Sequence, residues 1–499
     1  MKKTKIVESL KVWRKKAKSR GAKIRGYKRR TQARKEIHAQ SKRENQRLKL
    51  EVLKLRATLQ GRGAPAQIGS VVEQQALCVL VVVCAMVSFR SVPRLLGALQ
   101  PLLGTKLRIP HFTSVINWTL RVGIAVFSQV TAIAEPWAAI IDCSIDIGTR
   151  KALVVLRVPL CALQNKRGAI GPKDCECIGL EVSHQWNGVL VCGALTRIFK
   201  QTGVPSVILK DGGSDLKKGV ELYCTRNPEQ KIVIVDDLGH VVGNALKALY
   251  AASKSFTLFI KITAKIAARI RQTNLALFLP PKIRTKGRFL GITKLASWAG
   301  KILELLRTKN KAGDDPNLSK VRQAFAGLLP LRPFLKSFCR ACSTVELFLS
   351  LLKTSGLNET TYAAAKNILT KLPKRSLLRS RLTAWLEKHI GLQRALHLGQ
   401  LPLLVSSDAI ESLFGTFKTI VQRNPHAELN KLIYTIPLLC GNHSYRDINL
   451  ALNRCSHNQM LAYIEKTIPP TLRQQRYAQF KNHSKTVPKS ASFLSPDSA

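Results

Sequence analysis

The order of strand-like and helix-like segments in the middle of the chain restricts the fold more than any other feature. Three apolar, strand-like segments follow one another at 137–147, 151–160 and 177–183. Two helix–strand pairs come next, and their strands end at residues 211 and 237. Sequential strands pair readily, and strands joined through a helix usually run parallel. The order βββαβαβ therefore predicts an α/β fold with a mixed sheet.

Three acidic residues stand in apolar surroundings, although acidic residues are scarce. The chain has 29 of them against 81 lysines and arginines. Asp142 and Asp211 end strand-like runs, and Glu411 opens the apolar helical stretch AIESLF. A buried carboxylate is costly unless it is paired or binds a metal. Reactive groups of open α/β sheets gather at the carboxyl ends of strands, so Asp142 and Asp211 are expected to share a site.

The charge of the chain indicates what such a site acts on. The formal net charge is +52, which favours the phosphates of nucleic acid over an anionic membrane. Carboxylate oxygens suit Mg²⁺ or Mn²⁺, ions that also bind phosphate oxygens. Two such ions about 4 Å apart can activate an attacking oxygen and stabilise a leaving one. The residues therefore predict a two-ion site that acts on a polyanion.

Together these features resemble a DDE transposase of the insertion-sequence type, in the retroviral-integrase superfamily with an RNase H-like core. The resemblance covers about 135–445. It implies that Asp142, Asp211 and Glu411 are the catalytic acids and hold two Mg²⁺ or Mn²⁺ ions. Lys418 lies seven residues after Glu411 on the same helix face, where many members carry a basic residue that contacts DNA. The implied activity is metal-dependent DNA cleavage and strand transfer at the ends of a mobile element.

Nearby residues leave alternatives open. Asp237-Leu-Gly-His240 resembles a short motif of Mutator-like transposases, yet it equally fits a strand-end acid followed by a histidine at a helix N-terminus. Asp146 lies four residues past Asp142, so on a regular strand both point the same way and Asp146 could assist. Asp408 could be the N-cap of a capping box with Glu411, which gives Glu411 a purely structural role.

The N-terminal quarter has the features of a DNA-binding region. Residues 1–60 hold 22 lysines and arginines against four acidic residues, and a short coiled-coil-like leucine seam lies at 48–59. Residues 68–134 predict three helices. They fit either a helix-turn-helix module or an ordinary packing domain. In the first case the residues that face DNA are Thr113, Ser114, Asn117 and Arg121.

Six regions follow from these patterns. A basic helical arm (1–60) precedes the helix-turn-helix-like domain (68–134), and the first part of the RNase H-like core follows (135–243). The remaining regions are a large all-α insertion (244–400), the last core helices (401–445), and a C-terminal helix with a loose tail (446–499).

Two other functions compete with transposition. His443-Ser-Tyr-Arg446 followed by Tyr477 echoes the end of tyrosine recombinases, in which a tyrosine attacks the phosphate without a metal. The strand-rich middle is unexpected for that mostly helical fold. The third possibility is a non-catalytic DNA-binding protein with a decayed core.

Composition also predicts the setting of the protein. The longest apolar run, 76–87, is too short to span a bilayer, and no signal peptide is visible. Several of the 12 cysteines lie in apolar runs, which suits a reducing compartment. We therefore expect no membrane partner and a cytoplasmic location on the bacterial nucleoid. We also expect a homodimer or higher oligomer that assembles on DNA.

Overall fold

The computed structural model describes most of the chain after residue 70. The described residues are 71–103, 108–147, 150–162, 166, 169–282, 289, 291–307, 316–397, 399–421 and 429–486. The predicted basic arm 1–60 and its leucine seam lie outside them. The chain divides into two compact units, one of 1–70 with 93–109 and one of 71–92 with 110–499. Most of helix α3 (Ser91–Leu103) belongs to the first unit, and everything below concerns the second.

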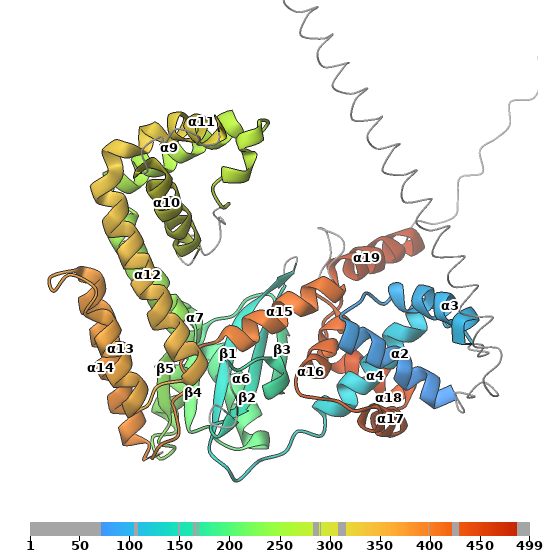
Figure 1. The fold of residues 1–499 in the computed structure, drawn as a ribbon. Helices are drawn as coiled ribbons and strands as arrows, with labels where there is room; N and C mark the ends of the chain where they lie inside the picture. Colours follow the sequence, from blue (N-terminus) through green and yellow to red (C-terminus); the bar gives the residue numbers. More distant parts are fainter. Residues whose placement is uncertain are drawn as a thin grey trace, which may run out of the picture. The chain divides into compact units, whose positions relative to one another are not determined.

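A five-stranded mixed sheet forms the centre of the second unit (Figure 1). Its strands are β1 (Trp137–Ile147), β2 (Arg150–Pro159), β3 (Glu176–Ser183), β4 (Val207–Lys210) and β5 (Val233–Asp236). They lie in the order β3-β2-β1-β4-β5. The β1–β2 and β2–β3 pairs are antiparallel, and β1–β4 and β4–β5 are parallel. The predicted element order and the mixed sheet are confirmed.

Helices cover both faces of this sheet. On one face, α6 (Gly188–Thr202) and α7 (Ser214–Arg226) form a core with strand residues such as Ala139 and Ile141. Side chains alternate along a strand, so Ala138 and Ile140 face the other way, and they too are fully buried. On that second face, α15 (Asp408–Val421) packs against β1. This double coverage explains why the strands are nearly continuous apolar runs.

A long helical segment separates β5 from α15. Its helices are α8 (Leu238–Tyr250), α9 (Lys254–Ile270), α10 (Ile292–Arg307), α11 (Pro316–Phe325), α12 (Arg332–Ser355), α13 (Glu359–Leu369) and α14 (Leu377–Ala395). The rings of Tyr250, Phe256 and Phe338 contact one another in tilted and edge-to-face arrangements inside it. His389 of α14 accepts a hydrogen bond from the backbone N–H of Asp236, so α14 borders the β5 edge. The segment is helical, as the pattern of 244–400 predicts.

The remaining helices form a cluster in which helices from residues 71–127 pack against helices from residues 436–467. Helices α2 (Val71–Ala85) and α4 (Phe112–Phe127) pack with α17 (Tyr445–Arg454), and α4 also contacts α16 (Ile436–Leu439) and α18 (His457–Thr467). Helix α19 (Leu472–Thr486) follows. A Cβ at Gly123 of α4 would lie 1.9 Å from the carbonyl oxygen of Tyr434, so only glycine permits this close approach. Helix α4 is therefore packed on C-terminal helices, and the domain boundaries 68–134 and 446–499 remain predictions.

Candidate functional site

Asp142 and Asp211 occupy matching positions on two neighbouring parallel strands. Ile141 of β1 pairs with Lys210 of β4, and each acid is the next residue along its strand direction. Adjacent strands lie about 4.8 Å apart, so the two acids are side by side at one edge of the sheet. Asp142 is buried, at 6% exposure, and Asp211 is half-buried. β1 and β4 are therefore direct neighbours in the sheet.

Local electrostatics agree with this placement. The Cys143 thiol lies next to Asp142, and burial raises its pKa, with further contributions from the negative charges of Asp142, Asp211 and Asp215. Asp142 lies on the sheet face of Ala138 and Ile140, which is the face that α15 covers.

A β-bulge follows Asp142 and changes the strand register. Asp142 pairs with Val154, whereas Asp146 pairs with Lys151, so four steps on β1 match three on β2. The extra residue breaks the regular alternation of β1. An accessory role for Asp146 stays a prediction.

A tight turn holds the Asp211 carboxylate. Its Oδ1 accepts a hydrogen bond from the backbone N–H of Gly213 at 2.7 Å, directly before α7 begins. A Cβ at Gly213 would lie 2.9 Å from the same oxygen, so a larger residue would push the carboxylate away. Asp215 is exposed in the first turn of α7, where the helix dipole favours an acidic side chain.

Asp237 lies next to Asp211 at the ends of neighbouring strands, and both of its carboxylate oxygens accept hydrogen bonds. Lys210 pairs with Asp236, so Asp237 stands beside Asp211 at the same edge. Its Oδ2 accepts from the backbone N–H of His240 at 2.8 Å and caps α8. Its Oδ1 accepts from the backbone N–H and the hydroxyl of Ser407, at 2.7 and 2.9 Å. Of the two interpretations of the Asp237–His240 motif, the structure contains the strand-end acid that caps a helix.

Ser407 is a residue of this region that the sequence pattern does not reveal. It lies 170 positions from Asp237, and no periodicity or spacing connects the two. Ser407 immediately precedes α15, and its carbonyl accepts the N–H of Ile410. Asp237 therefore ties the start of the Glu411-bearing helix to the carboxyl end of β5.

Glu411 lies in the first turns of α15, beside His240 of α8. The distance from Glu411 Oε1 to His240 Nε2 is 3.8 Å. Partial burial and the charges of Asp237 and Asp408 raise the pKa of the Glu411 carboxyl. Asp408 is the first residue of α15, and both of its oxygens lie 2.6 Å from the Lys353 ammonium. Asp408 therefore lies inside the helix, one residue after Ser407, whose carbonyl accepts the N–H of Glu411, and the Asp408 carboxylate is paired with Lys353.

The three predicted catalytic acids do not form one closed metal site here. Across the residues that the structure describes, no three His, Cys, Asp or Glu side chains are arranged to hold a metal ion. Asp142 and Asp211 form one pair, and Glu411 pairs with His240, with Asp237 linking the two groups. The carboxylates of Asp142 and Asp211 have the oxygen donors that Mg²⁺ prefers. Magnesium binding therefore stays a prediction.

The predicted DNA contacts occupy varied environments. Lys418 is half-buried on α15. On α4, Thr113 is exposed and hydrogen-bonded to His111, while Ser114 and Asn117 are half-buried. Arg121 donates to the carbonyl oxygens of Cys455 and Leu452, at 2.7 and 2.6 Å, at the end of α17. Arg121 thus has a packing role that the sequence did not reveal, and DNA contact by these residues stays a prediction.

Several other expectations can be placed in the structure. His443 Nε2 lies 2.7 Å from the Cys440 carbonyl oxygen, and Tyr477 is 69% exposed on α19. The five-stranded sheet also counts against a tyrosine recombinase. All twelve cysteines are free thiols. Among the helices described, none is both long and apolar enough to cross a membrane.

Comparison with known proteins gives little further guidance. No family model matches the chain, and no curated protein matches it. One solved structure is titled Drosophila P element transposase strand transfer complex. Its alignment covers 84% of this chain and 100% of the chain in that structure, with 13% sequence identity and a TM-score of 0.39. A likeness at that score does not establish a shared fold.

Proposed function

We propose that this chain is a metal-dependent DNA transposase with an RNase H-like core. The observation that carries the proposal is the pairing of Ile141 with Lys210, which sets Asp142 and Asp211 side by side at the carboxyl edge of the sheet. The strand order β3-β2-β1-β4-β5 is the arrangement that the resemblance to DDE transposases implies. Acids on the first and fourth strands of such a sheet are where that chemistry requires them.

The surroundings of the acid pair also support a cation. Asp142 and Asp211 directly follow paired residues on neighbouring parallel strands, and carboxylates placed side by side favour a shared cation. Mg²⁺ or Mn²⁺, when bound, would lower the pKa of a water molecule and offset phosphate charge. The helix that carries Glu411 begins at the same edge of the sheet, because Asp237 holds Ser407 through two hydrogen bonds.

The proposed reaction has two displacements at phosphorus. Water attacks the phosphodiester at the element end, the P–O3′ bond breaks, and a free 3′-OH remains. That hydroxyl then attacks a target phosphodiester, and the target's own 3′ oxygen leaves as a hydroxyl. The charge of +52 supports DNA as the substrate, since lysine and arginine release counterions from the duplex. Paired element ends would be joined by a homodimer or a larger assembly, with Lys418 as one phosphate contact.

Strand cleavage on a terminal-repeat duplex tests the proposal. Full-length protein with Mg²⁺ should produce a free 3′-OH, and EDTA should abolish the product. Asp142→Asn and Asp211→Asn should each lower cleavage by at least about 100-fold, an order-of-magnitude expectation for a lost electrostatic ligand. Asp215→Asn serves as the matched control and should retain activity.

Two other outcomes would each support one of the competing functions. Cleavage that survives EDTA and Asp211→Asn but is lost in Tyr477→Phe would identify a tyrosine recombinase and overturn the metal mechanism. DNA binding without cleavage under any divalent ion would leave a binding protein with a decayed core. The first outcome is read from the cleavage gel, and the second also needs a native gel-shift measurement with the same substrate.

A further inference from the structure

Helix α9 carries a stripe of exposed positive charge. Lys254, Lys261, Lys265 and Arg269 are exposed, and α9 contains no acidic residue. At about 100° per residue these four positions fall on one face of the helix. The helical repeat separates Lys261, Lys265 and Arg269 by about 6 Å each along the axis, at about 1.5 Å per residue. We call this set of four residues the α9 stripe.

The opposite face of α9 is fully used in packing. Phe256, Phe259, Ile266 and Ile270 are buried, and α9 contacts α11 and the short helix η3 (Ala326–Leu331). A helix that binds a membrane surface must present its apolar face to the lipid. The apolar face of α9 is already covered by other helices, so the surface that α9 offers to a partner consists mainly of charged side chains. One leucine, Leu258, is exposed along the stripe, at 47%.

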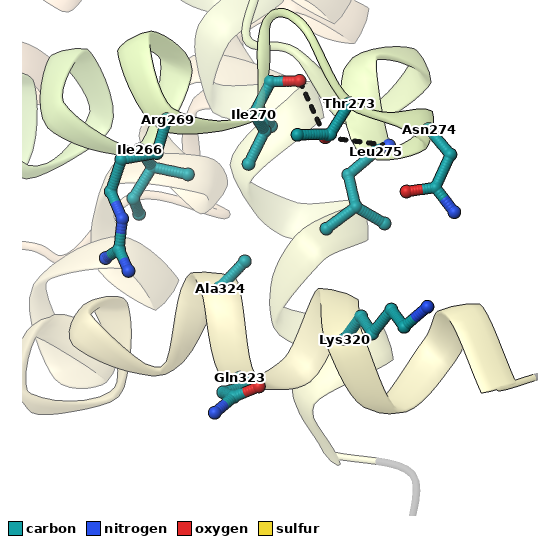
Figure 2. A pocket seen from close by; sticks show the side chains of 9 residues that line it. All are labelled: Ile266, Arg269, Ile270, Thr273, Asn274, Leu275, Lys320, Gln323 and Ala324. Atoms are coloured by element: carbon teal, nitrogen blue, oxygen red, sulfur yellow. Dashed lines mark hydrogen bonds between the residues drawn. The ribbon is translucent and has the colours of Figure 1, made fainter. Parts of the chain in front are cut away.

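A hollow at the end of the stripe extends it onto a second helix. Its volume is about 380 Å³, and Figure 2 shows α9 and α11 on its two sides. Ile266, Ile270 and Ala324 supply apolar surface, while Arg269 and Lys320 bring a cationic group from each helix. Among the described residues that line the hollow, none is acidic. A ligand here therefore meets two positive charges without a protein counter-charge in this lining.

We infer that the α9 stripe and Lys320 bind the sugar–phosphate backbone of DNA at a surface separate from the acid pair. This inference rests on the proposed function only in taking DNA as the partner. A linear row of cations about 6 Å apart, with no interspersed acid, suits a linear polyanion better than a compact anion. An acidic protein surface would instead be expected to meet a patch of mixed sign.

Salt dependence of DNA binding provides the test. The variant Lys261→Gln/Lys265→Gln/Arg269→Gln removes three charges from the stripe. The matched control, Lys371→Gln/Lys374→Gln/Arg375→Gln, removes three exposed charges between α13 and α14. Binding of the full chain to a duplex of about 30 base pairs is measured by fluorescence anisotropy over a salt series. The slope of log K against log salt should fall by about 3 in the stripe variant, at roughly 0.9 per lost phosphate contact, and by less than about 1 in the control.

The outcomes separate this inference from the proposed function. Equal slopes for the two variants would overturn the inference, as would a loss of binding to phosphatidylserine vesicles with no change for DNA. Lys261→Arg/Lys265→Arg should keep the wild-type slope, and circular dichroism confirms that each variant is folded. A chain that never cleaves DNA but shows the slope difference would refute the proposed catalysis and leave the α9 surface standing.

Discussion

The backbone N–H and the hydroxyl of Ser407 both donate to one carboxylate oxygen of Asp237, at 2.7 and 2.9 Å. The other oxygen of Asp237 caps α8 through the N–H of His240. One buried side chain therefore positions two helix starts, and these helices carry His240 and Glu411. Asp237 thus affects Glu411 in two ways, because it fixes the start of α15 and its charge raises the pKa of the Glu411 carboxyl.

We predict that Asp237→Ala lowers the free energy of unfolding by about 2–4 kcal/mol, because it removes a helix cap and leaves buried donors unpaired. Asp237→Asn retains one acceptor oxygen and should lose roughly half as much. Urea unfolding of the full chain measures both, with Asp215→Ala as the exposed control. A loss in Asp237→Ala no larger than that control would contradict the anchoring role.

Divalent ions should stabilise the fold through the acid pair. Anything that binds the native state alone raises the melting temperature by mass action. We expect Mg²⁺ or Mn²⁺ at about 100 times its Kd to add about 2.7 kcal/mol, and we expect Asp211→Asn to lose this effect. Without divalent ions the same variant should be at least as stable as wild type, because repulsion from Asp142 is removed. Thermal melts with and without EDTA provide the measurement, and an ion effect that Asp211→Asn leaves intact would place the ion elsewhere.

Arg121 should contribute to stability in the absence of any DNA. Its guanidinium holds two carbonyls at the end of α17, and hydrogen bonds from a charged donor are worth about 1.5–3 kcal/mol. Arg121→Gln should therefore lower the free energy of unfolding by about 2 kcal/mol in DNA-free buffer. Arg446→Gln, an exposed change on α17, is the control and should have little effect. Unchanged stability with weakened DNA binding would instead favour the helix-turn-helix role.

The buried ring of His389 should make stability fall in mild acid. Burial lowers the pKa of His389 to about 4, from 6.5 in an unfolded chain. The neutral ring accepts from the N–H of Asp236, and its other nitrogen lies 2.7 Å from the Trp385 carbonyl. The contribution is present above pH 6.5 and is lost as the pH falls toward 4, to a total of about 3 kcal/mol.

His389→Gln provides the comparison for that pH effect. Glutamine can still accept a hydrogen bond, but it does not titrate. Urea midpoints between about pH 7 and pH 4 should therefore fall less steeply in this variant than in wild type. His184→Gln, at an exposed position, is the control substitution. Identical slopes in all three proteins would show that His389 does not drive the acid sensitivity.

Much of the fold follows from local sequence patterns. The strands around Asp142 and Asp211 are apolar runs bounded by turns, and the helices between them have a clear helical repeat, so their order is readable directly. Parallel neighbours follow from the helical crossovers. The position of both acids at one edge of the sheet could therefore be predicted from the amino-acid sequence alone.

Contacts between distant segments could not be predicted in this way. The bulge after Asp142, the Asp237–Ser407 hydrogen bonds and the Asp408–Lys353 ion pair all depend on how segments meet in three dimensions. The sequence predicts Arg121 as an exposed basic residue, yet in the folded chain its guanidinium donates a hydrogen bond to the Cys455 carbonyl oxygen at the end of α17.

The sequence by itself determined the elements, their order and the scarcity of acids that singles out Asp142 and Asp211. The tertiary structure alone decided that Glu411 lies beside His240 of α8. The physical reason is the separation along the chain between the residues that interact. Periodicity reports the burial of a residue among its chain neighbours, whereas the position of α15 is set by hydrogen bonds to a carboxylate 170 positions away.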